Sequence, residues 1–429
     1  MKCISCGTDN NLKDRTANYG KCSNCGHAFV FEPTSMGITK LTDPMFAKVI
    51  SDISVNNTLF FTPKQMFYIL DNRFRNKAFN SGSFGCSYIF GMVFFTIFFS
   101  SFGGTLGGLT ANLIYQIIII TTLMKNAKSP KLNAASRKVS AKSLIFVGAF
   151  ILIIGIYSSA VILNSFPAFV IAVLLGIFSI YKGALLQNKT TIAQEYLISE
   201  SDYQDWLNRW QRVNGNIHKL LPAPQSLNNQ TILINPDVTA YSFDRLIVCE
   251  SADIAQFLIA NNFHFENNSA ILSITGYPES IFQTTMDMLR RNPELKVYAL
   301  HNCTPKSLGL INRLRTSPNW FQNSNITIID IGITPRQVIG AKKNIFIETS
   351  PQSASEASQL PSEICNNLSP DELQWLQAGN FVNLESFRPQ QLIQIIQHGI
   401  ANTLNLESDS GLLIASSSDT YIYSTQSFG

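Results

Sequence analysis

The sequence predicts a multidomain membrane protein with a four-cysteine N-terminal module, a small helical module, four transmembrane helices and an α/β domain with a parallel sheet. Three observations predict this architecture. Four of the eight cysteines form two Cys-x-x-Cys pairs near the start of the chain. Two long blocks, Ala78 to Met124 and Ser143 to Tyr181, contain no Asp, Glu, Lys or Arg. In the second half, short apolar segments alternate with helical ones, which is typical of parallel sheets.

The cysteine pairs are CISCG, with Cys3 and Cys6, and CSNCG, with Cys22 and Cys25. Two knuckles at this spacing predict a structural zinc site of four thiolates, in a zinc ribbon that covers residues 1–32. Four sulfur ligands fill the coordination shell, so His27 is expected to be a neighbour and not a ligand. Two disulfides, the alternative, would need an oxidising compartment. The remaining cysteines are expected to be buried thiols: Cys86, Cys249, Cys303 and Cys365.

Residues 40–80 are expected to form the small helical module. The segment DPMFAKVISDI offers Asp43 as a helix N-cap with Pro44 in the first turn. The segment FFTPKQMFYILDNRF repeats this device with Thr62 and Pro63. Apolar residues recur at helical spacing in both segments, so the sequence predicts two helices that pack together.

The two uncharged blocks predict a transmembrane region over residues 84–186. A bilayer core of about 30 Å needs about 20 helical residues, so each block is about twice as long as one span. Near its middle, each block contains residues that favour a chain reversal, SSFGGTLGG and NSFP. An unusually apolar soluble core is the alternative, but such cores rarely lack charge over so long a stretch. We therefore expect four spans, at roughly Phe84–Phe99, Leu106–Met124, Ser143–Leu163 and Ala168–Leu186.

The segment between the blocks, KNAKSPKLNAASRKVSAK, carries six Lys or Arg and no Asp or Glu, whereas the two reversals carry none. Short cytoplasmic loops are enriched in Lys and Arg. The basic loop Lys125–Lys142 and both termini are therefore expected on the cytoplasmic side of a plasma or inner membrane, with the bilayer as a partner. The flanks of the blocks are basic too, with Lys64, Arg73, Arg75, Lys77, Lys182 and Lys189.

An amphipathic helix and a linker are expected at residues 187–230, and the cytoplasmic α/β domain is expected at residues 236–405. Its expected strands are Arg245–Cys249, Ala270–Ile274, Lys296–Leu300 and Ile326–Ile331. The segment SPQSASEASQLPSE has the composition of a flexible loop. The segment SPDELQWLQAG predicts a helix with a capping box at its start. The Ser-rich tail 406–429 is expected to be loose. Parallel sheets bind ligands beyond the carboxyl ends of their strands, where the candidates are Glu250, Tyr277, His301, Asn302, Thr304 and Asp330.

Residues Leu246 to Arg315, with LIVCESADIAQFLIANN, AILSITGYP and VYALHNCTPKSLGLINRLR, resemble a toprim domain, the metal-binding fold of topoisomerases, primases and related nucleases. The resemblance implies that Glu250, at the end of a strand, occupies the position of the family's acid/base. The family's Asp-x-Asp pair, which holds Mg²⁺, corresponds to Asn302 and Thr304 here. Neutral oxygens hold Mg²⁺ weakly, so tight Mg²⁺ binding is not expected, although Asp330 could compensate in part.

A second resemblance links TPKQMFY, residues Thr62–Tyr68, to the winged-helix domain of the topoisomerase VI A subunit and its meiotic relative. In that family a tyrosine of this stretch attacks DNA, and Tyr68 corresponds to it. The segment ELQWLQAGNFVNLE is similar to the end of that family's toprim region. The similar parts cover about half of the chain, while the four-cysteine module and the membrane block depart from the family. A tyrosine that only packs in a helical core is the alternative for Tyr68.

Three functions remain open on the sequence. The first is a non-catalytic membrane protein that presents the zinc ribbon and the toprim-like domain to a cytoplasmic protein or nucleic acid. The second is a metal-dependent enzyme that cleaves phosphodiesters with Glu250, Asp330 and Tyr68. The third is a transporter component, although ionisable residues of the kind that mark transport paths are absent from the blocks. The first is favoured because both metal-binding aspartates are replaced and no phosphate-binding glycine loop is present.

Overall fold

The computed structural model divides the chain into two compact units, one formed by Met1–Asp71 with Ile198–Gly429 and the other by Asn72–Leu197. The expected tail, 406–429, lies outside the described residues, as do most of the linker after the amphipathic helix and the end of the predicted helical module at 76–80. The structure describes residues 1–37, 39–75, 84–132, 134–162, 164–187, 193–224, 243–279, 281–292, 294–322, 324, 326–341 and 345–402.

The N-terminal module consists of two knuckles on either side of the short helix α1, Leu12–Ala17. Its β-structure is limited, in the described residues, to the isolated bridges Lys2–Asp9 and Lys21–Ala28, so it is sparser than a zinc ribbon. A buried side chain of α1 holds the module to the following segment: Arg15 donates to both carboxylate oxygens of Glu32, at 2.8 and 3.0 Å. These hydrogen bonds lower the pKa of Glu32 to about 2.

Helix α2, Asp43–Ile53, begins one residue earlier than the sequence indicates. Thr42, not Asp43, is the N-cap, and its hydroxyl accepts from the backbone of Met45. Asp43 is instead fully buried, and its carboxylate accepts from the backbone N–H groups of Val30 at 2.9 Å and Phe31 at 3.0 Å. The expected cap thus fixes the end of the N-terminal module against the first turn of α2.

Helix α3, Pro63–Arg75, starts as the sequence predicts. The Thr62 hydroxyl accepts from the Gln65 backbone at 3.1 Å, and the Gln65 side chain accepts from the Thr62 backbone at 3.0 Å, which completes a capping box. The predicted amphipathic helix, α7, Glu200–Asn214, packs against the N-terminal helices instead of standing alone. Its Trp210 contacts Phe31 and Phe46, with ring centroids 6.2 and 4.8 Å away. Within the described part of this module, no β-hairpin of the kind that forms a wing is present.

The parallel sheet is present as predicted, with strand order β2-β1-β3-β4. Its strands are β1, Arg245–Cys249; β2, Ser269–Ser273; β3, Lys296–Leu300; and β4, Thr327–Asp330. The register aligns Cys249 with Ser273 and Leu300, so the carboxyl ends of the central strands meet at one edge. The residues that follow β1 and β3 are therefore brought side by side.

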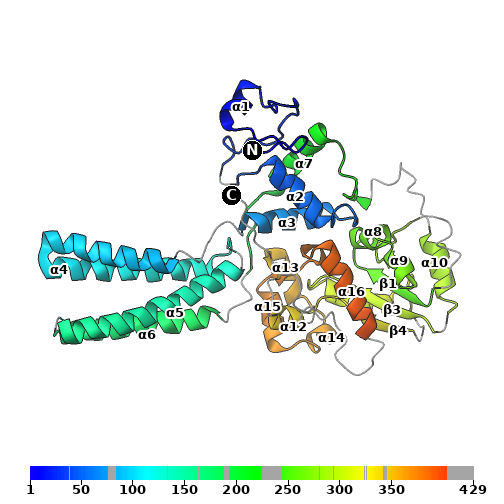
Figure 1. Cartoon of the computed structure of the whole chain (residues 1–429). Coiled ribbons are helices and arrows are strands. Elements are labelled where there is room, and N and C mark those ends of the chain that lie inside the picture. Colours follow the sequence, from blue (N-terminus) through cyan, green and yellow to red (C-terminus); the bar gives the residue numbers. More distant parts are fainter. Residues whose placement is uncertain are drawn as a thin grey trace. The chain divides into compact units, whose positions relative to one another are not determined.

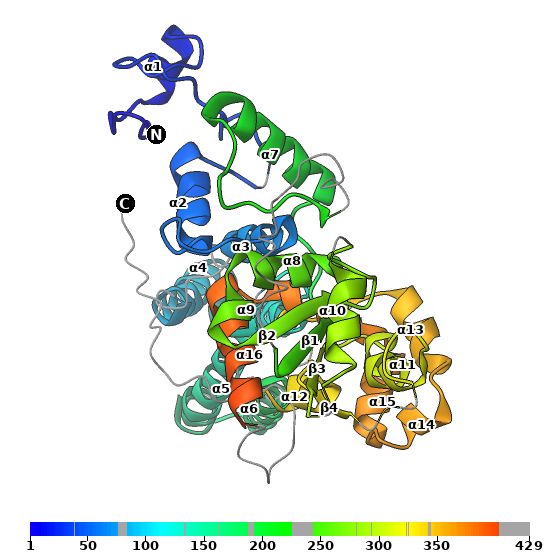
Figure 2. The same cartoon turned by 90° about the vertical axis from the view of Figure 1, so that its right-hand side faces the viewer.

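Helices cover both faces of the sheet, as its strands require, because nearly every residue of β1, β2 and β3 is buried. One face, with Leu246, Val248, Val297 and Ala299, packs on α10, Phe282–Leu289, and α11, Leu310–Thr316. The opposite side carries α8, Ala252–Ala260, α9, Phe263–Glu266, and α16, Pro389–Asn402. Figure 2 shows the strands between these two groups of helices. A four-stranded sheet with both faces covered gives a rigid edge for the side chains at the strand ends.

The segment after β4 contains more regular structure than its composition indicates. The helices are α12, Pro335–Gly340; α13, Pro351–Ser358; α14, Ser362–Cys365; and α15, Pro370–Gln377. Two short antiparallel strands, β5, Glu348–Thr349, and β6, Asn380–Phe381, join them. The expected flexible loop is wrong, because Ser350 caps α13 by accepting from the backbone of Ser353 at 3.1 Å and Pro351 occupies its first turn. The predicted capping box of Ser369 and Glu372 at α15 is confirmed.

In the second unit, three helices are long and apolar enough to cross a membrane. They are α4, Phe84–Lys128; the segment Ser136–Val161, which includes most of α5, Ala134–Tyr157; and α6, Phe166–Gln187. The longest, α4, is not straight: Gly104 has a non-helical conformation, with φ 61° and ψ −160°. The Tyr115 hydroxyl donates to the Tyr88 carbonyl at 3.1 Å, although these residues are 27 positions apart. Helix α4 is therefore a hairpin of two arms, and Figure 1 shows its ribbon doubling back.

Small residues bring α5 and α6 into close contact. A Cβ atom on Gly148 would lie 2.7 Å from the Gly176 carbonyl oxygen, and one on Gly183 would lie 2.9 Å from the Ala141 carbonyl oxygen. The buried Ser179 hydroxyl donates to the Leu144 carbonyl at 2.7 Å. Backbones approach in this way where Gly and Ala line a helix interface. The expectation of buried thiols is confirmed for Cys249 and Cys303 but is wrong for Cys86, which is exposed on α4, and Cys365 is half-buried.

Candidate functional site

The four predicted cysteines converge on one point. Their sulfur atoms all lie within 4.8 Å of one another, and the Cys3–Cys25 and Cys6–Cys22 sulfur distances are 3.7 and 3.6 Å. Zn–S bonds of about 2.3 Å in a tetrahedron place sulfurs about 3.8 Å apart. The set therefore fits a four-thiolate zinc ion, and within the described residues no other group of three or more His, Cys, Asp or Glu is this close. His27 is not part of the group.

The two knuckles have the same backbone. In the first, the Gly7 N–H donates to the Cys3 carbonyl at 2.9 Å, and in the second the Gly26 N–H donates to the Cys22 carbonyl at 3.0 Å. Both glycines have φ above 70°, a region that other residues rarely adopt. The glycine after each second cysteine is thus needed to close the turn around the two sulfur atoms of its knuckle.

Asn10, which the sequence did not single out, holds the knuckles together. It is fully buried, and its side-chain N–H groups donate to the Cys22 sulfur at 3.4 Å and to the Thr8 carbonyl at 3.0 Å. Its side-chain oxygen accepts from the backbone and the hydroxyl of Ser23, at 2.9 and 3.0 Å. Such contacts orient metal ligands and favour the thiolate form of the sulfur. Hydrogen bonds between Cys6 and the side chain and backbone of Thr8 lower the pKa of Cys6 to about 6.

The second cluster lies where β1 and β3 end. Glu250 follows β1, and its carboxylate accepts from the backbone N–H of Asn302 at 3.0 Å and from the Ser307 hydroxyl at 2.6 Å. The Thr304 hydroxyl donates in turn to Ser307 and accepts from its backbone at 3.1 Å. The sheet therefore brings Glu250, Asn302 and Thr304 together, as predicted. Each carboxylate oxygen of Glu250 is already engaged in a hydrogen bond.

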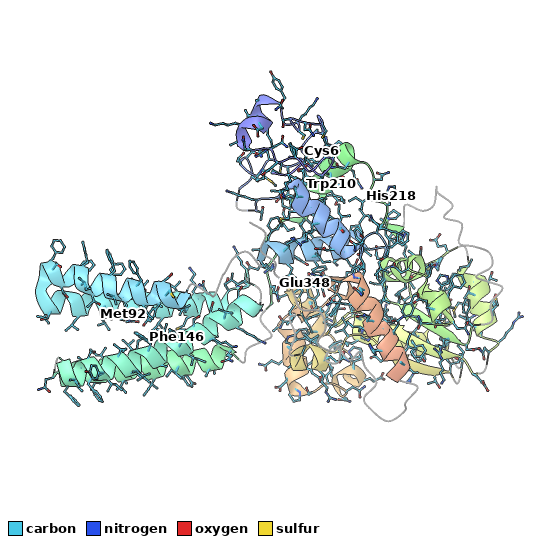
Figure 3. The ribbon with its side chains drawn as sticks, viewed as in Figure 1. Cys6, Met92, Phe146, Trp210, His218 and Glu348 are labelled. Atoms are coloured by element: carbon cyan, nitrogen blue, oxygen red, sulfur yellow. The ribbon has the colours of Figure 1, made fainter. Side chains whose placement is uncertain are left out.

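The third cluster surrounds Tyr68, which projects from α3. The Tyr68 hydroxyl donates to the Glu348 carboxylate, and the Asn383 side chain donates to both, at 2.9 Å to Tyr68 and 2.6 Å to Glu348. Tyr68 is 2% exposed, so its hydroxyl is enclosed as well as hydrogen-bonded. Figure 3 labels Glu348, which lies against α3.

A short segment after β6 joins the two clusters. Cys303 and Val382 form an isolated antiparallel bridge, and the Asn302 side-chain oxygen accepts from the Leu384 backbone at 2.7 Å. In the same segment, Glu385 accepts from the Thr62 hydroxyl at the start of α3, at 2.7 Å. Burial raises the pKa of Glu385, although Lys64 and Thr62 oppose the rise. Tyr68 and the strand edge therefore lie in one connected network.

Asp330 lies apart from Glu250, in an ion pair with His301. The Asp330 carboxylate is 3.0 Å from Nε2 of His301 and accepts from the Gly332 backbone at 2.8 Å. The other nitrogen, Nδ1, is 2.7 Å from the Asn302 carbonyl oxygen, so both ring nitrogens face acceptors, an arrangement that favours the doubly protonated ring. Burial disfavours the charge of His301, but Asp330, the Asn302 carbonyl and Glu250 outweigh burial and raise its pKa. Asp330 borders a cavity of about 510 Å³ that is also lined by Asn312, Arg315, Arg336, Asn367 and Glu372.

No protein-family model, curated protein or solved structure matches this chain. The functional reading therefore rests on the geometry of the clusters themselves.

The sequence named some members of these clusters and missed others. Tyr277 follows β2 as expected; burial and the charge of Asp253 raise its pKa. Ser307, Glu348 and Asn383 were missed. Asn383 lies within the ELQWLQAGNFVNLE segment that carried the resemblance, so a signal existed for it. No pattern pointed to Glu348, which stands between Ile347 and Thr349 without a motif around it.

Proposed function

We propose that this chain is an integral membrane protein that presents a zinc-stabilised, non-catalytic binding module to the cytoplasm. The observation that carries the proposal is the closure of the candidate catalytic groups on one another. Both carboxylate oxygens of Glu250 accept internal hydrogen bonds, and the Tyr68 hydroxyl is enclosed by Glu348 and Asn383. An enclosed nucleophile must first be exposed to its substrate, and the hydrogen bonds to Glu250 occupy part of its capacity to bind a metal. A binding module needs the same contacts for its shape.

The anchor in this proposal is the second unit, whose two α4 arms, α5 and α6 would cross the bilayer four times. Helix α4 has 45 residues, and its two-arm form supports two crossings instead of one. The basic loop Lys125–Lys142 would then face the cytoplasm with the zinc site and the α/β domain, in the reducing compartment that thiolate zinc sites need.

The partner proposed for the module is a protein. The N-terminal module offers Lys2, Lys13, Arg15 and Lys21 as cations, and Arg15 is already paired with Glu32. Phosphate backbones are held by several Lys and Arg at once, so this is a weak basis for nucleic-acid binding. Retention of the full chain on DNA that falls steeply with salt would favour nucleic acid instead.

The competing function is metal-dependent cleavage of phosphodiesters, in the manner that the topoisomerase VI A resemblance implies. One observation favours it: the Tyr68 hydroxyl donates to a carboxylate, as an activated nucleophile would, and the same network reaches Asn302 beside Glu250. In that reading the replaced aspartates must be compensated by other oxygen ligands.

A cleavage assay separates the two functions. The full chain in detergent micelles is incubated with supercoiled plasmid and millimolar Mg²⁺ or Mn²⁺, beside Tyr68→Phe and Glu250→Gln. We expect no nicking, no relaxation and no covalent protein–DNA product from any of the three. Cleavage by the wild-type chain that disappears in both variants would establish the enzyme and end the non-catalytic proposal.

A further inference from the structure

The second unit contains a cavity of about 480 Å³ between the α4 hairpin and the α5–α6 pair. Its walls are largely aliphatic, and among the residues that the structure describes no Asp, Glu, Lys, Arg or His lines it. Met92, labelled in Figure 3, is one of the lining residues on the first arm of α4. Its volume falls within the range of small-ligand pockets, about 300–1,000 Å³. Polar side chains are few in this wall: Thr96, Thr110, Asn112, Gln116, Ser158 and Ser159.

Three of these polar residues form a row across the two arms of α4. The Asn112 side-chain nitrogen donates to the Thr96 hydroxyl at 2.7 Å, and the Gln116 nitrogen donates to the Asn112 oxygen at 3.4 Å. The buried Tyr88 hydroxyl donates to the Gln116 oxygen at 2.7 Å and completes the row. These bonds hold the arms together, and in them the side-chain oxygens of Thr96, Asn112 and Gln116 all serve as acceptors.

The same bonds leave one N–H of Asn112 and one of Gln116 that no described residue accepts, and both side chains line the cavity. Each carboxamide nitrogen carries two N–H groups, and the bonds to Thr96 and Asn112 use one from each residue. Inside a bilayer no water is available, and an unsatisfied polar group costs several kcal/mol. Asn112 and Gln116 lie one turn apart on one arm, so a ligand with hydrogen-bond acceptors would satisfy both.

The opposite wall includes η2, Ser158–Ile162, a π-helical turn at the end of α5. Ser158 and Ser159 line the cavity from this turn, and their hydroxyls donate to the carbonyls of Gly155 and Ile156, at 3.2 and 3.1 Å. Short π-helical turns in α-helices are frequent at functional sites. The turn therefore adds a second, independent sign that this part of the block is built to bind.

The depth of the polar row restricts the ligand. Met92 is eight residues from the start of α4 at Phe84, and Asn112 is eight residues from the reversal at Gly104, about 12 Å in each case at 1.5 Å per residue. In a core about 30 Å thick, both positions lie near the middle. The ester carbonyls of glycerolipids lie at the edges of that core, and charged headgroups lie outside it. A ligand of this row is therefore uncharged, hydrophobic along its length, and carries carbonyl oxygens close to the bilayer centre.

We propose that this cavity binds an isoprenoid quinone of the membrane, with its ring carbonyls accepting from Asn112 and Gln116. The proposal rests on the membrane placement of the second unit and concerns binding alone. An uncharged ring with two carbonyls and a long hydrocarbon tail satisfies the two amides and the aliphatic walls at this depth. The cavity lacks the charges that a phosphate-bearing lipid would require.

The test measures quinone binding to the full chain in phosphatidylcholine nanodiscs. Phe150, which borders the cavity, is replaced by Trp as a reporter, and the signal of the four native tryptophans is subtracted with the unaltered chain. Decylubiquinone is expected to quench the added tryptophan saturably. Asn112→Leu and Gln116→Leu in the Phe150→Trp chain should each weaken binding about tenfold, the effect of about 1.4 kcal/mol per lost hydrogen bond.

Two further variants make the result decisive. Ala168→Phe fills the cavity from α6 without touching the polar row and should abolish quenching, whereas Thr121→Val, on an exposed part of α4, should leave it unchanged. Quenching that is absent, that does not saturate, or that survives both Leu variants and Ala168→Phe overturns the proposal. So does a site that dioleoylglycerol occupies while decylubiquinone does not.

Failure of the membrane placement is distinguished by a separate measurement on the same preparation. Alkaline carbonate extraction releases proteins that do not span the bilayer. A chain that stays in the membrane fraction but shows no quenching overturns the quinone site alone, whereas release into the supernatant overturns the proposed membrane placement as well.

Discussion

At the scale of single residues, the polar side chains that the sequence did not single out connect those that it did. Asn10 links the two cysteine knuckles, Ser307 completes the environment of Glu250, and Asn383 bridges Tyr68 and Glu348. Each of them satisfies a buried group whose hydrogen bonds would otherwise be lost, at a cost of about 1–3 kcal/mol. The clusters are therefore sensitive to substitutions at positions without any motif.

The first residue-scale prediction concerns Asn10→Ala. It removes the donor to the Cys22 sulfur and both bonds that fix Ser23, so the thiolates are less well oriented. We expect about a tenfold loss of zinc affinity, at the lower end of what such supporting residues contribute. Competition with a chromophoric chelator measures it. The matched control is Asn18→Ala, at an exposed asparagine whose side chain donates to the Asp14 carbonyl. Equal affinities for Asn10→Ala and wild type would refute the role.

The second residue-scale prediction concerns the His301–Asp330 pair. The raised pKa of His301 means that the pair stabilises the fold fully below the ordinary histidine value of about 6.5 and loses this contribution as the pH rises through the raised value. The lowered pKa of Asp330 means a second loss as the pH falls below about 3.9. Burial opposes the charge of Asp330, but His301 and the Gly332 N–H outweigh it.

Thermal unfolding of the full chain in micelles, followed by tryptophan fluorescence, tests the pair. The difference in unfolding temperature between wild type and His301→Gln should shrink as the pH rises from 6 toward 9. A difference that stays constant over this range would show that the imidazolium charge does not contribute. Gly332 is unsuitable as a probe, because a Cβ atom there would lie 2.4 Å from the His301 ring.

At the scale of elements, short apolar strands that alternate with helices, and helices with explicit caps, could be predicted. β1 and β3 have the predicted bounds, and α15 has the predicted capping box. The errors have physical causes. Composition alone marked the α13 segment as a loop, yet the Ser350 cap, Pro351 and packing against α15 make it helical. The N-cap of α2 was misplaced because Thr42 and Asp43 both suit the position, and a contact with Val30 and Phe31 decides between them.

The candidate site could be predicted only in part, for a similar reason. Residues at the ends of parallel strands converge by topology, so Glu250, Asn302 and Thr304 could be placed together from the sequence. The partners of Tyr68 come from β5 and from the segment after β6, far away in the chain. No local pattern records such a tertiary contact. The cysteine site was the most predictable, because the spacing of the two knuckles is that of known four-thiolate zinc sites.

An element-scale prediction concerns the packing of α5 on α6. Gly148→Ala would place a Cβ atom 2.7 Å from the Gly176 carbonyl oxygen and 2.9 Å from the Ile180 backbone nitrogen, so the two helices must separate. We expect destabilisation by about 1–3 kcal/mol, the usual cost of an overpacked contact. Helical circular dichroism during heating in micelles measures it. The control is Gly85→Ala on α4, where a Cβ atom meets nothing within 4 Å. If both variants melt alike, the close packing does not hold the pair.

At the scale of the whole molecule, the charge pattern of the second unit would decide which compartment receives the zinc site and the strand-edge network. The basic loop follows the second arm of α4, which ends at Lys128. The reversal at Gly104 lies at the other end of that arm. A zinc site of four thiolates requires the reducing side, and the proposed binding role places the α/β domain on that side too. The proposal of function and the orientation of the helices therefore depend on each other.

The orientation is tested by cysteine labelling in intact cells with a membrane-impermeant maleimide. Gly103→Cys, beside the reversal, should be labelled from outside, and Lys131→Cys, exposed in the basic loop, should react only after the membrane is opened. The chain without either change gives the background of its own thiols. In a second variant, Lys131→Cys is kept as the labelling site, the other four lysines of the loop are replaced by Gln, and the buried Arg137 is unchanged. This variant should insert in both orientations, because the excess of positive charge sets the orientation. If the lysine-free loop still reacts only in opened cells, the fixed charges do not set the orientation, and another part of the chain does.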